Sequence, residues 1–312
     1  MRSAHECRIC AIGEGMMELS GPTGDQRLAY GGDAINTAVH LARCGRDVRF
    51  ASALGDDPYS AGLRAAWERE SVSTELVIEA PGRLPGLYAI RTDEAGERTF
   101  HYWRGESAAR AMFEAPGSAT MIEAAADCDL FYFSLISLAI LDAAGRDRLI
   151  AIAEKVRANG GRVAFDGNYR ARLWPDHATA RAVRDRALAV ADIGLPTLAD
   201  EIEMGAAGGA EAVAAHWRAA GVGETIVKLG SAGCLVDGAI VPPPPCATVR
   251  DTSGAGDAFN AGYLHARLAG LSAAHAALSG HRLAGWVIER PGAIPDLAAD
   301  APYAVLIGAA GR

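Results

Sequence analysis

The sequence lacks a basic surplus, long apolar runs and a high density of charge, and each absence excludes a class of protein. Its 312 residues carry a net charge of -8, so no basic surplus exists to neutralise the phosphates of a nucleic acid. It has no run of 18 apolar residues and no apolar signal segment at its start, so we expect a cytoplasmic protein without a membrane partner. Only 22% of the residues are charged and 50% are hydrophobic, which predicts a sizeable core rather than disorder. We therefore expect a globular protein that acts on a small molecule.

Cysteine is also sparse, and its spacing is not that of a metal site. Cys7 and Cys10 form a C-x-x-C pair, but no second pair follows at zinc spacing. Both lie in a segment typical of a β-strand, where a three-residue offset turns side chains to opposite faces. We interpret the six cysteines as small hydrophobic residues and predict no protein-bound metal site.

Strand-like and helix-like segments alternate along most of the chain. Gly160 and Gly161 end one helical segment and Gly221 ends another, as glycines at helix C-termini do. This alternation predicts an α/β fold with a mostly parallel central sheet and helices on both faces, in a single domain over residues 1–312. The expected strands span residues 7–12, 48–54, 130–134, 162–166, 192–196, 224–229 and 233–236. The expected helices span residues 33–44, 58–70, 118–126, 138–159, 176–190, 209–220, 255–270 and 272–288.

Two segments interrupt this alternation. Residues 13–31 are polar and rich in turn-forming residues, and residues 84–104 have the pattern of a β-hairpin around a turn at 93–96. We expect the two segments to form one small β-sheet that stands on the main domain as a lid. The alternative is a surface hairpin without a function.

A glycine-rich turn meets a long amphipathic helix in the segment DTSGAGDAFNAGYLHARLAG, residues 251–270. The backbone N–H groups of Gly254, Ala255 and Gly256 lie where the helix begins, which is a site that binds anions. Asp257 follows directly and places a proton acceptor beside the anion, as transfer of a phosphoryl group to a hydroxyl requires. No lysine follows the glycines, so this is not a Walker-type loop. The alternative is an ordinary helix N-terminus with a capping aspartate.

Two other turns are candidates for ligand contacts. In VKLGSAGCLV, residues 227–236, a Gly-Ser-Ala-Gly turn beside Lys228 is suited to the phosphates or ribose of a nucleotide, although hairpin turns of this kind are common. In GGDAIN, residues 31–36, the paired glycines permit close approach of a ligand, and we expect Asp33 to cap the following helix. Asn36, one turn into that helix, is suited to binding sugar hydroxyls.

Tyrosines and arginines mark a third group of candidates. Tyr88, Tyr102 and Arg104 lie in the expected lid, and Asn168 and Arg170 follow a strand end, where ligands bind in open α/β sheets. Arginine binds carboxylates with two parallel hydrogen bonds, and tyrosine offers a hydroxyl group and a flat face. The set favours a small, hydroxylated carboxylic acid, with surface salt bridges as the alternative.

These motifs, in this order, resemble the PfkB or ribokinase-like carbohydrate kinases over essentially the whole chain. Within the family the likeness is closest to 2-keto-3-deoxygluconate kinases. It rests on IGEGMMELS, GGDAINTAVHLAR, RLPGLYAIRTDEAGERTFHYWR, FDGNYRARLW, TLADE, DTSGAGD and GHRLAGWVIERPGAIP. The resemblance implies a three-layer α/β/α domain with a small β-sheet lid, ATP and Mg²⁺ as cofactors, and a homo-oligomer, with a dimer formed through the lid.

The resemblance also implies a role for each candidate residue. Asp257 would deprotonate the terminal hydroxyl of the sugar, and Gly254, Ala255 and Gly256 would form the anion hole. The residues implied for the nucleotide are Asn168, Lys228, Gly230, Ser231, Gly233, Gly254, Gly256 and His281. The residues implied for the sugar acid are Gly32, Asn36, Tyr88, Tyr102, Arg104, Arg170 and Asp257. Many relatives have an N-x-x-E motif near magnesium, whereas Thr197 and Asp200 stand at those positions here, so magnesium is expected to arrive with ATP and keep most of its water.

Other functions stay open. A kinase for fructose, ribose or the galactonate epimer would use the same phosphate site, but paired arginines have no carboxylate to bind in a neutral sugar. A sugar-acid sensor without catalysis would not need Asp257. A dinucleotide-dependent oxidoreductase is disfavoured because IGEGMME stands where G-x-G-x-x-G would follow the first strand.

Overall fold

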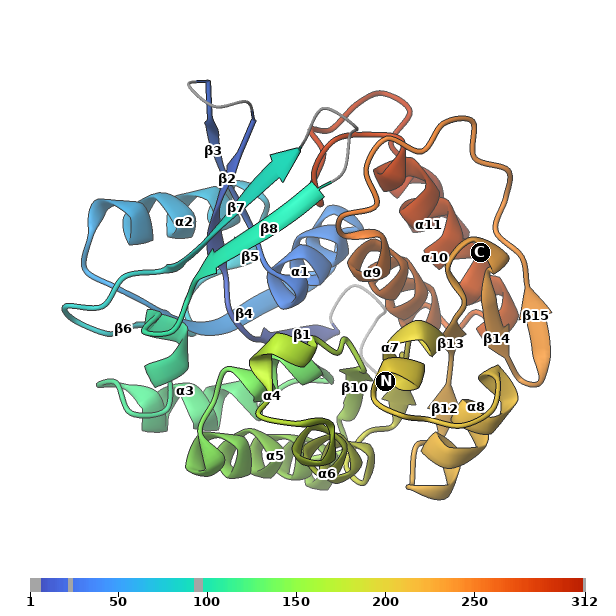
Figure 1. The fold of residues 1–312 in the computed structure, drawn as a ribbon, viewed down its shortest axis with the longest axis horizontal. Helices are drawn as coiled ribbons and strands as arrows, with labels where there is room; N and C mark the ends of the chain where they lie inside the picture. Colours follow the sequence, from blue (N-terminus) through green and yellow to red (C-terminus); the bar gives the residue numbers. More distant parts are fainter. Residues whose placement is uncertain (1–6, 22–24, 93–97, 311–312) are drawn as a thin grey trace.

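A parallel sheet runs through the centre of the molecule, in the order β12-β11-β10-β9-β1-β4-β5, with β6 also pairing with β4 (Figure 1). The computed structural model describes residues 7–21, 25–92 and 98–310. Every strand pair described in this sheet is parallel, as the alternation of strands and helices predicts. The strands are β1 (Arg8–Ile12), β4 (Asp47–Leu54), β5 (Val72–Ser73), β6 (Val77–Glu79), β9 (Leu130–Ser134), β10 (Arg162–Asp166), β11 (Ile193–Gly194) and β12 (Glu224–Thr225).

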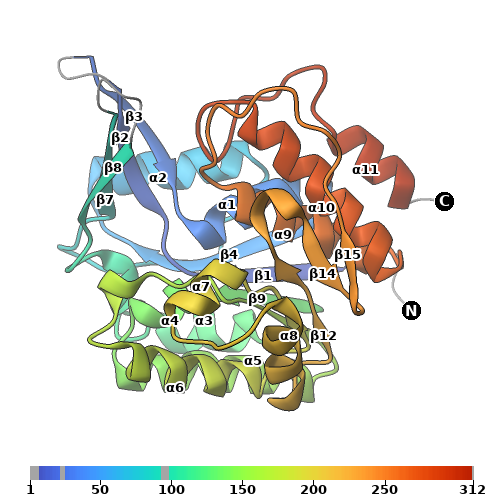
Figure 2. The same cartoon turned by 45° about the vertical axis from the view of Figure 1, so that its right-hand side comes forward.

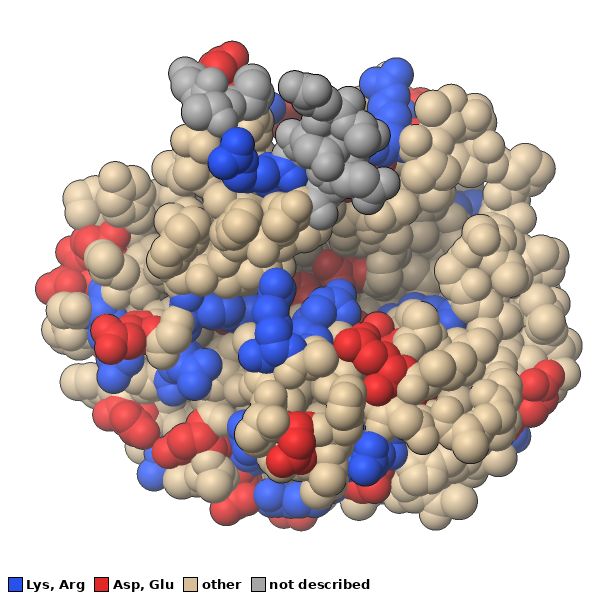
Figure 3. Space-filling model, viewed as in Figure 1, with Lys and Arg blue, Asp and Glu red and all other residues tan. Residues whose placement is uncertain are grey.

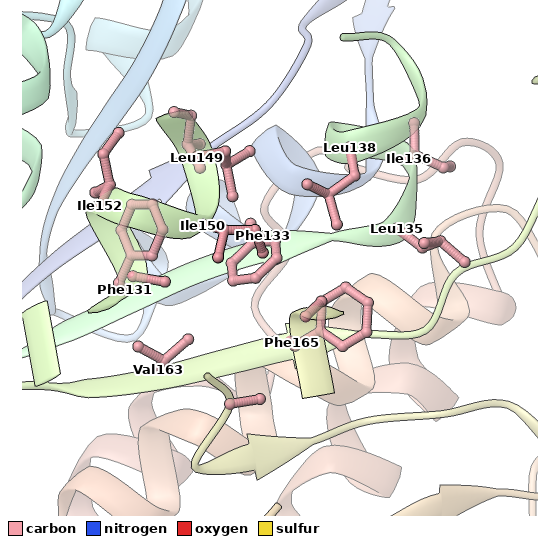
Figure 4. Packing of buried hydrophobic residues seen from close by; sticks show 14 of the residues in the cluster. Phe131, Phe133, Leu135, Ile136, Leu138, Leu149, Ile150, Ile152, Val163 and Phe165 are labelled. Carbon is pink, nitrogen blue, oxygen red and sulfur yellow. The ribbon is translucent and has the colours of Figure 1, made fainter. Parts of the chain in front are cut away.

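Helices cover both faces of the sheet, which gives three layers (Figure 2). Successive residues of β9 point to opposite layers: Phe131 and Phe133 pack in one hydrophobic cluster with Phe165 of β10 (Figure 4), and Tyr132 packs in the other. The first layer holds α3 (Ser118–Ala125), α4 (Leu135–Ala139), α5 (Ala143–Ala158), α6 (His177–Leu188), α7 (Leu198–Glu203) and α8 (Ala210–Ala219). The second holds α1 (Asp33–Arg43), α2 (Pro58–Arg69), α9 (Ala255–Leu268), α10 (Ala273–Ile288) and α11 (Tyr303–Ala310).

A second, four-stranded sheet stands above the first in Figure 1 and is called the lid sheet below. Its order is β3-β2-β7-β8, so the two interrupting segments form one sheet, as expected. The strands are β2 (Met16–Ser20), β3 (Arg27–Gly31), β7 (Gly86–Thr92) and β8 (Arg98–Trp103). β2 pairs with β3 antiparallel and with β7 parallel, which joins the two segments through backbone hydrogen bonds. The expected turn at 93–96 lies outside the described residues.

Three local expectations were wrong. The helix expected over 138–159 is two helices, because a capping box of Ser134 and Ser137 starts α4 and the side chain of Asp142 caps α5. The strand expected over 224–229 is divided between β12 and β13 (Val227–Lys228), which pairs in a separate small sheet with β14 (Cys234–Val236) and β15 (Ala239–Val241).

The third correction concerns the start of α1. The cap position is Gly32, with φ of 145°, and Asp33 is the first helical residue with no side-chain capping bond. A Cβ atom on Gly32 would lie 2.2 Å from the carbonyl oxygen of Glu14, so only glycine fits there.

Within the described part of the chain, no helix is both long and apolar enough to cross a bilayer.

Candidate active site

A cavity of about 1310 Å³ lies between the lid sheet and the main domain. Figure 3 shows this hollow below the lid, with basic side chains along its lower wall and acidic ones inside it. Residues from every candidate motif line it, although they are distant in the chain. The predicted site residues lining the cavity are Gly32, Asn36, Tyr88, Tyr102, Arg104, Asn168, Arg170, Lys228, Gly230, Ser231, Gly233, Gly254, Ala255, Gly256, Asp257 and His281. The fold therefore brings all of them together, and their individual roles remain predictions.

The anion site lies at the N-terminus of α9. Gly254 precedes the helix with φ of 70°, and a Cβ atom there would lie 2.5 Å from the Cβ of Ala293, so the turn requires glycine. The carboxylate of Asp251 stabilises this turn, because it accepts hydrogen bonds from the N–H groups of Ser253 at 2.9 Å and Gly292 at 2.7 Å. The first N–H groups of a 14-residue helix thus face the cavity, where the helix dipole favours a negative charge.

Asp257 lies in the first turn of α9 and is 7% exposed. Its Oδ2 accepts a hydrogen bond from Nδ2 of Asn36 at 2.8 Å. Burial, with the nearby carboxylates of Asp33 and Asp166, raises the pKa of Asp257 to about 8, although Asn36 and Lys228 oppose the shift. A carboxylate whose pKa lies near neutrality is suited to accept a proton from a hydroxyl group.

Lys228, one of only two lysines in the sequence, lies beside the anion site. Its Nζ donates to Oδ1 of Asp166 at 2.9 Å and to Oδ1 of Asn260 at 3.1 Å. Asn260 also donates to the second oxygen of Asp166 at 2.9 Å, which closes the network. A Cβ atom on Gly256 would lie 3.8 Å from Nζ, so the ammonium group adjoins the anion hole.

Sequence reasoning missed Asp166 and Asn260. A usable signal exists for Asp166, which is the last residue of β10, at the strand end where ligands bind in such sheets. Asn260 lies one turn after Asp257 on α9, and only the packed helix reveals that it meets Asp166.

The lid sheet presents a row of side chains to the cavity. Glu18, Tyr88 and Tyr102 are neighbours across β2, β7 and β8. The hydroxyl group of Tyr88 donates to Oε2 of Glu18, and the rings of Tyr88 and Tyr102 stack with centroids 5.7 Å apart. Across the cavity, the guanidinium carbon of Arg172 lies 3.4 Å from the centroid of the Tyr102 ring.

Both predicted arginines already face carboxylates of the protein. Arg104 forms an ion pair with Glu14, and the two side chains are 8% and 1% exposed. Nη1 of Arg170 lies 3.7 Å from Oδ2 of Asp200 on α7, and that oxygen also accepts the N–H of Tyr169. Sequence reasoning missed Glu14, although it belongs to the motif IGEGMMELS, because nothing in the chain pairs it with Arg104, 90 residues later.

The Gly-Ser-Ala-Gly turn, His281 and Asn168, which are predicted to contact a nucleotide, also line the cavity. The expected Gly-Ser-Ala-Gly turn is a 3-10 helix, Gly230–Ala232, and a Cβ atom on Gly233 would lie 2.1 Å from the carbonyl oxygen of Val241. Nε2 of His281 lies 3.0 Å from that same oxygen, and burial lowers the pKa of His281, which favours the neutral ring. Asn168 donates to Asp33 at 3.3 Å, which links the end of β10 to the start of α1.

Comparison with known proteins identifies the family. The sequence model of the pfkB family carbohydrate kinases matches residues 7–300, nearly the whole chain. The chain belongs to the pfkB family. Among relatives, a 2-dehydro-3-deoxygluconokinase of Dickeya dadantii is 43% identical over 302 residues, which cover 93% of this chain and 97% of the relative. The protein of that name from Escherichia coli K12 is 43% identical over 298 residues, covering 92% and 96%.

Solved structures support the same fold. The 2-dehydro-3-deoxygluconokinase of Thermotoga maritima superposes with a TM-score of 0.81 at 20% identity, covering 98% of this chain and 100% of that one. The predicted ribokinase-like α/β/α architecture with a small additional sheet is thus confirmed for this pfkB family member.

Proposed function

We propose that this pfkB family member transfers the γ-phosphoryl group of ATP to the 6-hydroxyl of 2-keto-3-deoxygluconate, also called 2-dehydro-3-deoxygluconate. The observation that carries the proposal is the position of Asp257, a buried carboxylate with a pKa of about 8 beside the N-terminus of α9. The relatives at 43% identity carry the name of this activity.

In the proposed reaction, Asp257 accepts the proton of the 6-hydroxyl as its oxygen attacks the γ-phosphorus. The bond from phosphorus to the bridging oxygen breaks, and ADP leaves with that electron pair. The N–H groups of Gly254, Ala255 and Gly256 stabilise charge on the phosphoryl oxygens, and Asn36 orients the carboxylate through its 2.8 Å hydrogen bond. The sugar is converted to its 6-phosphate.

The sugar acid would lie under the lid sheet. Arg104 and Arg170 would face its carboxylate, while Tyr88 and Tyr102 would cover its carbon chain. Gly32 and Asn36 lie at the start of α1, next to Asp257, so they would contact the hydroxyl groups near the reacting end. A lid closed over the sugar would exclude water and prevent hydrolysis of ATP.

ATP would occupy the opposite end of the cavity. Its phosphates would extend to the N-terminus of α9 and to Lys228, and Asn168, Gly230, Ser231, Gly233 and His281 would surround the nucleotide. Magnesium would arrive with ATP, where it neutralises phosphate charge. The carboxylates of Asp166 and Asp200 line the cavity and are oxygen ligands of the kind that Mg²⁺ prefers.

The proposal includes a homo-oligomer formed through the lid sheet and a cytoplasmic location, where ATP is available. Exposed apolar side chains on the lid sheet support the first part, since Trp103 is 61% exposed and Leu28 is 48% exposed. Sedimentation of the protein and of Trp103→Glu would test it, because a dimer through this surface should dissociate in the variant.

A coupled ADP-release assay with Mg-ATP tests the function directly. It compares 2-keto-3-deoxygluconate, its galactonate epimer, fructose and ribose at equal concentration. We expect turnover on the keto acids alone. Higher turnover on fructose or ribose would retain the phosphate site and overturn the substrate assignment, and absence of turnover on all four would favour a sensor.

A further inference from the structure

The basic side chains that line the cavity differ in what they face. Arg104 pairs with Glu14, Arg170 faces Asp200, and Lys228 pairs with Asp166. Each of these cations is already balanced by a carboxylate of the protein. An incoming carboxylate must share those cations with the protein's own acidic groups.

Arg172 differs from these three. It lines the same cavity, yet no carboxylate among the described residues lies within ion-pair distance of it. Its described contact is with the face of the Tyr102 ring, at 3.4 Å from guanidinium carbon to ring centroid. Arg172 is therefore a positive charge at the cavity wall that no described acidic side chain neutralises.

The stacking leaves the hydrogen-bonding edges of Arg172 available. A guanidinium group that lies on an aromatic face directs its N–H donors outward in its own plane, which is the geometry that a carboxylate binds with two parallel hydrogen bonds. Tyr102 is itself held in place, because it stacks on Tyr88 at 5.7 Å and on Phe100 at 6.4 Å. The row of rings thus gives the guanidinium group an ordered aromatic face to lie on.

The two stacked residues come from opposite walls. Arg172 belongs to a 3-10 turn, Ala171–Leu173, that follows β10 in the main domain, and Tyr102 belongs to β8 of the lid sheet. Basic side chains line the hollow opposite the lid in Figure 3. A ligand carboxylate bound to Arg172 would therefore be held where the lid meets the main domain.

We propose that Arg172 is a further substrate-recognition residue, which binds the carboxylate of the sugar acid and sets the preference for acids over neutral sugars. The inference rests on the proposed function. Arg172 would act together with Arg104 and Arg170. Of the three arginines that line the cavity among the described residues, it is the one without a described carboxylate partner.

A matched pair of ligands tests it: 2-keto-3-deoxygluconate and its neutral carboxamide, with binding measured by calorimetry and KM by the coupled assay. We expect Arg172→Gln to weaken binding of the acid about 10- to 100-fold, to leave binding of the carboxamide within about threefold, and to leave the KM for ATP unchanged. Arg172→Lys should recover part of the preference, since it retains the charge without the planar stack. Arg186→Gln is the control, because Arg186 of α6 makes an exposed ion pair with Asp147 of α5 and neither residue lines the cavity.

Equal weakening of both ligands in Arg172→Gln would overturn the proposal, since it would mean that Arg172 only holds the lid sheet against the main domain. Unchanged binding of the acid would overturn it as well. Wild-type protein that turns over no keto acid would instead contradict the proposed function, before any variant is compared.

Discussion

Nδ2 of Asn36 lies 2.8 Å from Oδ2 of Asp257, although 221 positions separate the two residues in the chain. The contact joins the first turn of α1 to the first turn of α9, so the glycine-rich starts of both helices open into one site. It also fixes which oxygen of Asp257 is engaged by the protein and leaves the other for a substrate.

Replacement of Asp257 by asparagine should remove catalysis and retain binding. We expect kcat to fall by about 10²–10⁴-fold, as for loss of a general base, while calorimetry shows sugar-acid affinity within a fewfold of wild type. A rapid-quench measurement would show whether the chemical step is the one affected. Near-normal kcat in Asp257→Asn would remove Asp257 from the proposed role.

The pKa of Asp257 predicts the pH dependence of activity. The base acts only when deprotonated, so kcat/KM for the sugar should rise about tenfold per pH unit below about 8 and level off above it. Asn36→Ala removes a donor that stabilises the carboxylate, so the midpoint should move to higher pH. A profile that is flat from pH 6 to 9 in the wild type would contradict the assignment.

The same pKa predicts how Asp257 affects stability. Its pKa is raised in the folded protein, so the folded state binds more protons than the unfolded chain between about pH 4 and 8, and stability falls as the pH rises through this range. Asp257→Asn should therefore increase the free energy of unfolding by on the order of 5 kcal/mol above pH 8, with little effect near pH 4. Urea unfolding of both proteins at the two pH values measures the difference, and an equal effect at both would contradict the prediction.

Loss of Lys228 should affect stability and activity in separable ways. Lys228→Met leaves the buried carboxylate of Asp166 without its cation and should cost about 3–5 kcal/mol of unfolding free energy. The double variant Lys228→Met/Asp166→Asn should recover most of that stability, because no unpaired charge remains. Activity should stay low in both variants, since the ammonium group beside Gly256 is absent; recovered turnover in the double variant would show that the lysine has only a structural role.

The Glu14–Arg104 pair predicts a response to ligand. Glu14→Gln leaves the guanidinium group of Arg104 buried without its counter-charge, so the free protein should lose about 3 kcal/mol of stability. A bound sugar acid would supply the missing negative charge. The rise in melting temperature upon addition of 2-keto-3-deoxygluconate should therefore be larger in this variant than in the wild type, and an equal rise in both would contradict the prediction.

Local signals were sufficient for much of the fold and for the candidate residues that line the cavity. Glycines before Asp257 and before α1 mark helix starts whose backbone geometry excludes a side chain, and such requirements are visible in the chain itself. Helix ends were less well predicted where a polar side chain competes with the helix. The carboxylate of Asp142 caps the start of α5 and so separates α5 from α4. The spacing of apolar residues continues across this position, so it does not predict where one helix ends and the next begins.

The partners of the candidate residues could not be predicted in the same way. Nothing in the sequence distinguishes Glu14, Asp166 and Arg172 from other charged residues. Their roles become visible only in the folded protein, where Glu14 pairs with Arg104, Asp166 pairs with Lys228, and Arg172 stacks on Tyr102. A contact of this kind depends on strand order and on how the lid sheet sits on the main domain. The spacing of residues within one segment therefore cannot predict such a contact.

The parallel pairing of β2 with β7 also limits how this protein can be redesigned. The lid sheet is built from two stretches of chain, so a graft that exchanges only residues 84–104 would pair β2 with a foreign strand. A foreign strand that did not match β2 would leave β2 and β3 as a two-stranded ribbon with a row of unpaired backbone groups, which invites aggregation. A change of sugar specificity by segment exchange must move residues 13–31 and 84–104 together.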